Sequence, residues 1–250
     1  MTTLSSGADA PANNLLCALR PDDFALLRPD LRPTFLRPGQ VLYEPGDEVR
    51  QVYFPVERTL LAFRVVLADG RAVETALVGR EGAMCGIVSQ GRLPSYSRAE
   101  VLHDGPVLRM DVEQLEGAKM KSLSIRHLFA RYADCLMAQV FQSVACNAVH
   151  SIEQRAAKWL ISAMERTSDA RVSLTQQQVA DMLGVGRSYV SRVIQSLKAR
   201  NLIETHRGSL TVADPDGLRA LACGCHDSVR RHFEEVLKGV YPDEPIKASA

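Results

Sequence analysis

Residues 174–200, LTQQQVADMLGVGRSYVSRVIQSLKAR, decide the fold of this chain because they predict two short helices joined by a tight turn. Thr175 can begin the first helix, since a threonine hydroxyl accepts a hydrogen bond from the backbone N–H groups of the first helical turn. An apolar stripe at helical spacing follows, formed by Val179, Met182 and Leu183. Gly184 stands where that helix should end, because glycine adopts the left-handed conformation that closes helices. The stretch therefore predicts a helix-turn-helix.

The second helix of this stretch is predicted to have one apolar face and one polar, basic face. Its apolar positions are Val190, Val193, Ile194 and Leu197, and its polar positions are Arg187, Ser188, Ser191, Arg192, Gln195 and Lys198. In a helix-turn-helix protein the second helix enters the DNA major groove, where the two donors of an arginine match guanine O6 and N7. Residues 171–208 hold six Lys or Arg against two Asp or Glu, a charge of +4 (6 − 2) in a chain of net charge +1. We expect DNA binding; the alternative is a three-helix unit whose charged face only meets water.

Length and composition set the class of protein. A chain of 250 residues suits two domains, and its balanced charge means that any contact with nucleic acid must come from a local patch. Residues 1–14 are predicted to be disordered and lack the basic start and apolar core of a signal peptide. No run approaches the ~18 apolar residues of a membrane helix, so we expect a cytoplasmic protein without a membrane partner. The six scattered cysteines show no disulfide framework, and free thiols are expected.

Between about residues 31 and 110 the pattern changes to short strands with turn residues at close intervals. Pro-Gly pairs precede the segments QVLYE and VRQVYFP, and Asp69-Gly70 separates LLAFRVVLA from RAVETALV. The Asp-Gly pair predicts a hairpin because it accommodates the positive φ angles of a two-residue turn. The strands SRAEVLH and GPVLRMD follow. Many short strands at regular spacing predict a β-sandwich or barrel of the jelly-roll kind. A helical segment over residues 15–27, interrupted by Pro21, precedes it.

Helical periodicity returns at Val112 and is strongest over residues 125–149. A 3-4 alternation runs through Ile125, Phe129, Tyr132, Leu136, Val140, Ser143 and Asn147. Such a seam on an uninterrupted helix is expected for helices paired in a dimer, and the alternative is packing against the chain's own barrel. A hinge near His150-Ser151 leads to the first helix of the DNA-binding domain, SIEQRAAKWLISAMER. After residue 200, LIET and SLTV predict a β-wing, and one helix is predicted over residues 214–237.

The order of a glycine-punctuated barrel, a long helix and a winged helix-turn-helix resembles the cyclic-AMP receptor protein/FNR (Crp/Fnr) family of bacterial transcription regulators. The resemblance covers about residues 30–215 and rests on LRPGQVLYEPGDEVRQVYFP and, more specifically, on LTQQQVADMLGVGRSYVSRVIQSLKARNLIETHRGSL. It implies an α+β protein with an N-terminal jelly-roll barrel, a long dimerisation helix and a C-terminal winged helix-turn-helix. The implied parts are a disordered N-terminus (1–14), a cyclic-nucleotide-binding-like effector domain (15–120), the dimerisation helix (121–149), the DNA-binding domain (150–215) and a C-terminal helix and tail (216–250).

The resemblance also implies which residues contact DNA. They are Thr175, Gln176 and Gln177 where the first helix crosses the phosphate backbone, Arg187, Ser188, Tyr189, Ser191 and Arg192 on the recognition helix, and His206 and Arg207 in the wing. Cyclic-AMP-type members usually carry Glu where this sequence has Ser188, whereas Ser191-Arg192 matches the FNR branch, so Arg192 is the expected guanine reader. The implied partners are a second copy of this chain, pseudo-palindromic double-stranded DNA and RNA polymerase.

The effector is harder to infer, because the family's cyclic-nucleotide residues are missing. Members that bind cyclic nucleotides have a Gly-Glu-Leu segment followed by Arg-Ser or Arg-Thr, and that arginine pairs with the cyclic phosphate. Aligned through the segment SRA, those two positions fall on Leu93 and Pro94, which offer neither charge nor hydroxyl. Glu81, Arg92 and Arg98 are the candidate effector residues, although recruiting Glu81 and Arg92 requires a shifted register. We expect an unidentified small-molecule effector and no response to cyclic AMP.

No catalytic residue, cofactor or metal site is predicted. Iron–sulfur clusters of the FNR type need several closely spaced N-terminal cysteines, and only Cys17 lies there. Cys223, Cys225 and His226 could take part in a metal site with His232. However, Cys225 fits the apolar stripe of its predicted helix, and a free cysteine behaves as a small buried hydrophobe.

Two alternatives to a ligand-responsive regulator remain open from the sequence. A cupin-type metal enzyme on the barrel needs His-x-His with further Glu and His ligands, whereas the barrel segment holds one histidine, His103. The other alternative keeps the DNA-binding module and makes the barrel a scaffold without a ligand.

Overall fold

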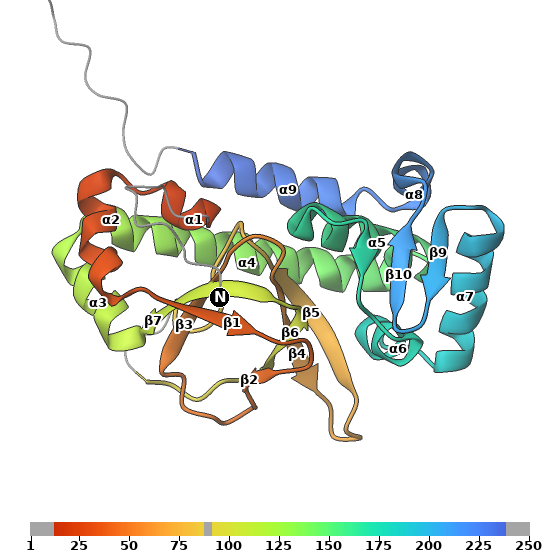
Figure 1. Ribbon diagram of the computed structural model, residues 1–250, viewed down its shortest axis with the longest axis horizontal. Helices are drawn as coiled ribbons and strands as arrows, with labels where there is room; N and C mark the ends of the chain where they lie inside the picture. The colour runs from red at the N-terminus through yellow and green to blue at the C-terminus, as the bar shows by residue number, and fades with distance from the viewer. Residues whose placement is uncertain (1–12, 88–91, 239–250) are drawn as a thin grey trace, which may run out of the picture.

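The computed structural model of this protein describes residues 13–87 and 92–238 (Figure 1). Its β-barrel and its helix-turn-helix lie at opposite ends of the long helix α4 (Leu123–Val149). Before the barrel come α1 (Asn14–Cys17), α2 (Pro21–Leu27) and the 3-10 turn η1 (Arg28–Asp30). Pro21 starts α2, where its missing N–H costs no helical hydrogen bond, so the predicted interruption separates two helices.

The barrel consists of two antiparallel sheets, as in a jelly roll. One sheet has the strand order β1-β7-β3 and the other the order β2-β6-β4-β5. The strands are β1 (Arg32–Leu36), β2 (Val41–Tyr43), β3 (Gln51–Pro55), β4 (Leu60–Val66), β5 (Ala72–Val78), β6 (Arg98–His103) and β7 (Gly105–Asp111). The predicted hairpin joins β4 to β5, and Gly70 in its turn has a φ of 83°. The predicted jelly-roll fold is confirmed.

Side chains from both sheets fill the barrel interior. The buried members are Leu36, Tyr43, Leu61, Val78, Met84, Cys85, Ala99, Val101 and Val107. The Tyr43 hydroxyl accepts hydrogen bonds from the backbone N–H groups of Arg50 and Gln51, at 3.0 and 2.7 Å. These clustered side chains are uncharged, so among the described residues the apolar core of the barrel offers no cation to an anionic ligand.

Helix α3 (Val112–Lys121) follows the last barrel strand directly, and α4 begins after the N-cap Ser122. The buried residues of α4 are Ile125, Leu128, Phe129, Tyr132, Cys135, Gln139 and Cys146. The first four share an apolar core with Val52 and Phe54 of the barrel. The predicted dimer seam is therefore wrong for Ile125, Phe129 and Tyr132, which are at most 1% exposed within their own chain. Their alternation is explained by the alternative, packing against the barrel.

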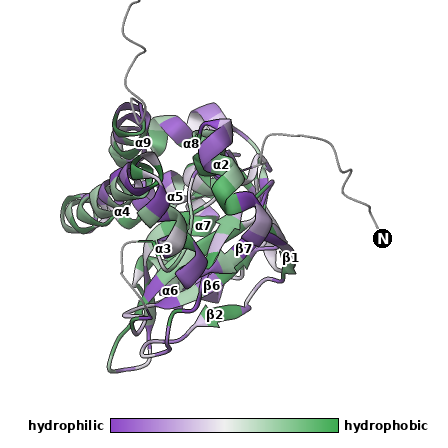
Figure 2. Cartoon of the chain, turned by 90° about the vertical axis from the view of Figure 1, so that its left-hand side faces the viewer, coloured by the Kyte–Doolittle hydropathy of each residue, from purple (hydrophilic) through white to green (hydrophobic). Residues whose placement is uncertain are grey.

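The opposite face of α4 carries a second apolar stripe, which is exposed. Its members are Met137, Val140, Phe141 and Val144, and Phe141 and Val144 are 65% and 66% exposed. In Figure 2, α4 lies at the outer edge of the molecule with hydrophobic residues on its outward side. The helix is thus apolar on two faces, and only one of them is covered within the chain.

The DNA-binding domain contains three helices and a small sheet. Its elements are α5 (Ile152–Thr167), β8 (Arg171–Val172), α6 (Gln176–Leu183), α7 (Arg187–Ala199), β9 (Ile203–His206) and β10 (Ser209–Val212). The strands form an antiparallel sheet of order β8-β10-β9. The predicted helix-turn-helix and wing are confirmed, and β8 adds a strand that the sequence did not indicate.

The C-terminal part forms two helices, α8 (Pro215–Leu221) and α9 (Cys225–Val236), where the sequence predicted one. The break has a local cause: Ala222 is extended, with a φ of −64° and a ψ of 152°, and Gly224 is the N-cap of α9. Helix α9 returns alongside α4 (Figures 1 and 2), and the rings of Phe233 and Tyr132 meet edge to face at 6.2 Å. Over residues 13–87 and 92–238, no helix is both long enough and apolar enough to span a membrane.

One apolar core joins the barrel to the DNA-binding domain. Leu60, Ala62 and Leu77 on the outer face of the β4-containing sheet belong to the same buried cluster as Trp159 of α5. The Trp159 indole Nε1 also donates a hydrogen bond to Glu74 Oε1 of β5 at 2.8 Å. This shared core fixes the position of the helix-turn-helix relative to the barrel.

Candidate DNA-binding surface

The turn between α6 and α7 forms because both ends of α6 are capped by its own sequence. Gln178 N donates to Thr175 Oγ1 at 3.2 Å and Thr175 N donates to Gln178 Oε1 at 2.9 Å, a reciprocal capping box. At the other end Gly184 is left-handed, with a φ of 68° and a ψ of 32°. Val185 N then donates to the Ala180 carbonyl at 3.0 Å, which turns the chain into α7.

Helix α7 buries one face and exposes a polar one, as its periodicity requires. Val190, Val193, Ile194 and Leu197 pack in the domain core, whereas Arg187, Ser188, Tyr189 and Arg192 are exposed. The Arg192 guanidinium carbon lies 5.1 Å from the centroid of the Tyr189 ring, a cation–π distance. Tyr189 therefore supports an arginine that points away from the protein.

Ser191 and Gln176 have a structural contact in addition to their predicted role at the DNA. The Ser191 hydroxyl donates to Gln176 Oε1 at 2.9 Å, which links the start of α6 to the middle of α7. Gln177 is exposed and donates to Asp181 Oδ1 at 2.8 Å. The pair of Ser191 and Gln176 therefore fixes the angle between the two helices.

A groove of about 410 Å³ lies between the start of α6, the start of α7 and the wing. Thr175, Gln177, Arg187 and His206 are among its lining residues. Gly208 has a φ of 75° and closes the wing turn beside the exposed Arg207. Hydroxyl, amide and guanidinium donors around a groove suit the contacts that proteins make to phosphate oxygens.

The three candidate effector residues bind different partners instead of facing one ligand. Arg92 Nη2 pairs with Glu113 at 3.0 Å, and Arg98 Nε pairs with Glu44 at 2.9 Å. The Glu81 carboxylate accepts from Arg166 Nε at 2.7 Å and from the Gly79 backbone at 3.1 Å. Glu81 and Arg92 thus pair with residues of different elements, and their role at an effector stays a prediction.

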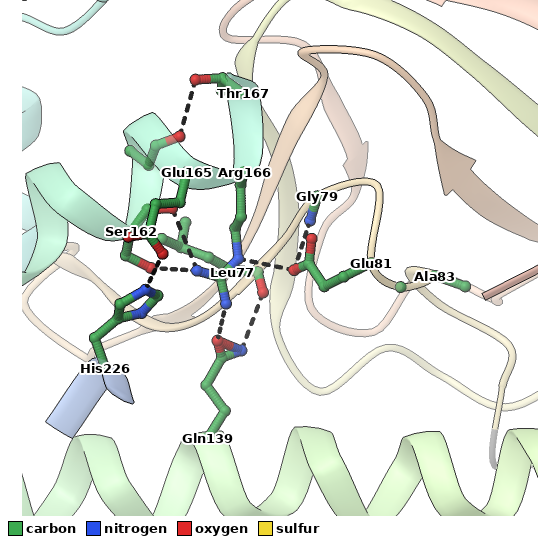
Figure 3. A network of polar contacts seen from close by, with 12 residues as sticks. Leu77, Gly79, Glu81, Ala83, Gln139, Ser162, Glu165, Arg166, Thr167 and His226 are labelled. Atoms are coloured by element: carbon green, nitrogen blue, oxygen red, sulfur yellow. Dashed lines mark hydrogen bonds and ion pairs between the residues drawn. The ribbon is translucent and has the colours of Figure 1, made fainter. Parts of the chain in front are cut away.

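Arg166 connects the barrel, α4 and the DNA-binding domain. Its side chain points from α5 between Glu81 and Gln139 (Figure 3), and Nη2 donates to Gln139 Oε1 at 3.1 Å. Gln139 Nε2 in turn donates to the Leu77 carbonyl of β5 at 3.0 Å. Arg166 also donates to the Ser162 hydroxyl. Glu81 is thus part of an interdomain contact that the sequence did not reveal, because Arg166 is 85 residues away.

A cavity of about 470 Å³ lies beside this contact, between the barrel, α5 and α9. Arg80, Glu81, Arg166 and Arg230 contribute charges to its wall, and Phe233 contributes an apolar ring. Neither Arg92 nor Arg98 is among the residues that line it. At the family's phosphate-binding positions, Leu93 is 50% exposed and its carbonyl accepts from Val49 N at 3.0 Å.

Comparison with known proteins agrees with this architecture. Residues 154–221 match the family model described as a Crp-like helix-turn-helix domain. The global nitrogen regulator of Nostoc sp. (strain PCC 7120 / SAG 25.82 / UTEX 2576) is 24% identical over 199 residues, which cover 75% of this chain and 87% of that protein. Residues 154–221 therefore form a Crp-like helix-turn-helix domain, in a chain that has the fold of Crp/Fnr-type transcription regulators.

Solved structures show the same fold in other proteins. FixK2 from Bradyrhizobium japonicum superposes with a TM-score of 0.65 at 16% identity, covering 77% of this chain and 98% of that one. A CRP-family transcriptional regulator from Thermus thermophilus gives a TM-score of 0.64 at 20% identity, covering 76% and 96%. The proteins from Nostoc and Thermus thermophilus are both named as regulators.

The regulator also brings together side chains of the metal-binding type outside the barrel. Ligand atoms of Cys146, His150, Cys223 and Cys225 all lie within 4.8 Å of one another. The two histidines that the sequence associated with this segment bind carboxylates instead: His226 Nε2 lies 2.7 Å from Glu165 Oε2, and His232 Nε2 lies 3.0 Å from Asp134 Oδ2. Sequence reasoning missed Cys146 and His150, whose spacing of four residues on a helix was the available signal.

Proposed function

We propose that this regulator binds double-stranded DNA as a homodimer and that Arg192 reads a guanine in each half-site. The observation that carries the proposal is the exposed polar face of α7, where Tyr189 supports Arg192 from within the same helix. Over the described residues, Arg187, Arg192 and Arg207 form no ion pair, so their charges remain for an outside anion. Residues of the adjoining groove are expected to hold the phosphate backbone on either side.

The dimer contact in this proposal is the exposed stripe of α4, Met137, Val140, Phe141 and Val144. Its spacing of three and four residues suits a pair of helices, and its burial would remove a continuous apolar surface from water. A twofold axis along α4 would present two copies of α7, so the operator should be a pseudo-palindrome with half-sites about one helical turn apart.

The proposal has two remaining parts. One is a small-molecule effector other than cyclic AMP, and the other is a contact with RNA polymerase. The case against cyclic AMP is electrostatic, because a buried cyclic phosphate needs a cation or several donors to replace its hydration. Among the described residues the apolar core of the barrel consists of uncharged side chains, and Pro94 lacks even a backbone N–H. The contact with RNA polymerase rests on family resemblance alone.

The dimer and its operator are tested by selecting bound sites from random DNA and by sedimentation equilibrium. Wild-type protein should sediment as two chains and select a pseudo-palindrome. Phe141→Lys should raise the dimer dissociation constant roughly tenfold or more and weaken operator binding with it, because a charge would be buried in an apolar contact. Gln40→Lys is the matched control, since Gln40 is exposed in the barrel segment and lies outside α4. A monomeric wild-type protein, or equal effects of both substitutions, would contradict the proposed seam.

Titration calorimetry with cyclic AMP tests the effector part. We expect no heat of binding at physiological concentrations and no change in operator affinity. A micromolar dissociation constant together with a matching rise in operator affinity would overturn this part, and Glu81 and Arg92 would then be the first residues to replace.

A further inference from the structure

Four side chains with soft ligand atoms meet where the dimer helix ends and the C-terminal helices change direction. Cys146 lies in the last turn of α4, and His150 is the C-cap of that helix. Cys223 lies in the break between α8 and α9, and Cys225 is the first residue of α9. Two segments of the form C-x3-H and C-x-C, more than 70 residues apart, therefore supply two ligands each.

The distances inside this cluster are close to those of a tetrahedral metal site. Cys146 Sγ lies 3.5 Å from Cys223 Sγ, and Cys225 Sγ lies 3.6 Å from His150 Nδ1. Zinc bonds of about 2.3 Å to sulfur and about 2.0 Å to nitrogen imply tetrahedron edges of roughly 3.8 Å between sulfurs and roughly 3.6 Å between sulfur and nitrogen. Since all four ligand atoms lie within 4.8 Å of one another, an ion would need them to move by about 1 Å or less.

Burial by itself does not account for the cluster. Cys146, Cys223 and Cys225 form a separate buried group that contains no aliphatic or aromatic side chain, unlike the apolar cores of the barrel and the DNA-binding domain. A cysteine that only fills space would be expected among such side chains. His150 is half-buried and leaves a route from solvent.

The surroundings suit thiolate ligands. Gln142 Nε2 donates a hydrogen bond to Cys225 Sγ at 3.1 Å, the kind of outer contact that orients a metal ligand. Cys225 also occupies the first position of the twelve-residue helix α9, where the helix dipole favours negative charge.

We propose that Cys146, His150, Cys223 and Cys225 bind one divalent ion of the zinc class. Soft thiolates with one imidazole select such ions over the hard cations that prefer oxygen ligands. On binding, the thiols release their protons to solvent and four metal–ligand bonds form. The ion ties the end of α4, immediately before the hinge into α5, to the junction of α8 and α9, and so holds the C-terminal helices against the DNA-binding domain.

Reduced, metal-free full-length protein should be titrated with Co²⁺ and then with Zn²⁺. We expect the visible absorption of tetrahedral cobalt with thiolate ligands, saturating at one ion per chain and lost when zinc is added. Cys225→Ser and His150→Ala should each weaken binding at least tenfold, and Gln142→Ala about tenfold as an outer ligand contact. Cys17→Ser is the matched control, because Cys17 is exposed on α1 and outside the cluster.

Thermal unfolding provides a second measurement that does not depend on any one variant folding well. Zinc should raise the unfolding midpoint of the wild type and of Cys17→Ser, and should raise that of His150→Ala less at the same zinc concentration. No cobalt absorption in the reduced wild type, or the same cobalt affinity in Cys225→Ser as in Cys17→Ser, would overturn the proposal. A disulfide between Cys146 and Cys223 in freshly purified protein, with no bound metal, would also overturn it. None of these readouts requires DNA binding, so the metal site can fail while the proposed function stands.

Discussion

Two groups of arginines in this regulator are used in opposite ways. In the barrel and at its contact with α5, Arg64, Arg98 and Arg166 bind carboxylates of their own chain at 2.7–2.9 Å. On the helix-turn-helix and wing, Arg187 and Arg192 are exposed and form no ion pair within the part of the chain that the structure describes. An arginine already bound to a carboxylate has little to offer a phosphate, whereas an exposed and unpaired one does.

The two groups of arginines are therefore expected to have different roles, one in the stability of the protein and the other in DNA recognition. The paired arginines should control stability, because they are wholly or partly buried and their loss leaves a carboxylate without its partner. The unpaired arginines should control DNA affinity and leave stability almost unchanged, because exposed charges contribute little to folding.

The largest effect is expected from Arg166→Ala. The Arg166 and Glu81 side chains are 10% and 25% exposed, so the substitution leaves Glu81 unpaired and also removes the donors to Gln139 and Ser162. Breaking a buried ion pair of this kind costs about 3–5 kcal/mol, and the urea midpoint should fall accordingly.

Arg92→Ala is the control for Arg166→Ala. Arg92 pairs with Glu113 at the surface, where both side chains are largely exposed, and such a pair contributes about 0–1 kcal/mol. Similar losses for the two substitutions would show that the interdomain contact is no stronger than a surface pair.

The second expected effect depends on pH and concerns Glu74. Burial raises its pKa to about 7, against the hydrogen bond from Trp159 and the charge of Arg64. Its Oε2 is buried and has no hydrogen-bond partner among the described residues. The pKa of Glu74 in the folded protein lies above its value of about 4.3 in the unfolded chain. The contribution of Glu74 to the free energy of unfolding is therefore fully present below the unfolded pKa, and it is lost as pH rises through about 7.

Glu74→Gln keeps an acceptor for the Trp159 indole and removes the ionisation. It should raise the free energy of unfolding at pH 8 by up to roughly 3 kcal/mol and change it little at pH 5. Urea unfolding at both pH values, followed by Trp159 fluorescence, measures the difference. A stabilisation of equal size at pH 5 and pH 8 would mean that ionisation of Glu74 is not its cause.

The same comparison explains which features the sequence could predict. The helix-turn-helix was predictable because its determinants are local: the cap at Thr175, the left-handed Gly184 and two apolar stripes, all within 27 residues. The ion pair of Glu81 with Arg166 was not predictable, because the two residues are 85 positions apart and only the docking of α5 on the barrel brings them together.

Helix α4 and the cysteine cluster show two further limits of prediction from the sequence. Both Ile125 and Phe141 belong to apolar stripes at helical spacing, so periodicity alone could not decide which stripe faces the barrel. Predicting the cysteine cluster from the sequence would have required knowing that α9 returns alongside α4. The break that starts α9 had a local signal in Gly224, since glycine interrupts a helical pattern.

The third effect is expected at the recognition helix. Arg192→Ala should cost about 1–3 kcal/mol on the selected operator and relax the preference for one G·C pair in each half-site. Lys198→Ala removes a charge from the exposed surface of the same helix and should weaken all sequences alike. Competition binding with operators mutated at single positions distinguishes the two, and a uniform loss for Arg192→Ala would assign Arg192 to phosphate instead of base contact.

The smallest effect is expected from Arg207→Ala in the wing. Arg207 is exposed beside Gly208 at the wing turn, where a phosphate contact carries no sequence information. Its removal should weaken operator and non-operator DNA equally and reduce the slope of log K against log salt by about one, because one fewer counterion is released. Arg219→Ala is the matched control, since Arg219 is already paired with Glu165 at 2.9 Å and its loss should leave the slope unchanged. If Arg207→Ala left the slope unchanged and Arg219→Ala lowered it, an ion pair within the chain would no longer indicate which arginines are kept from DNA.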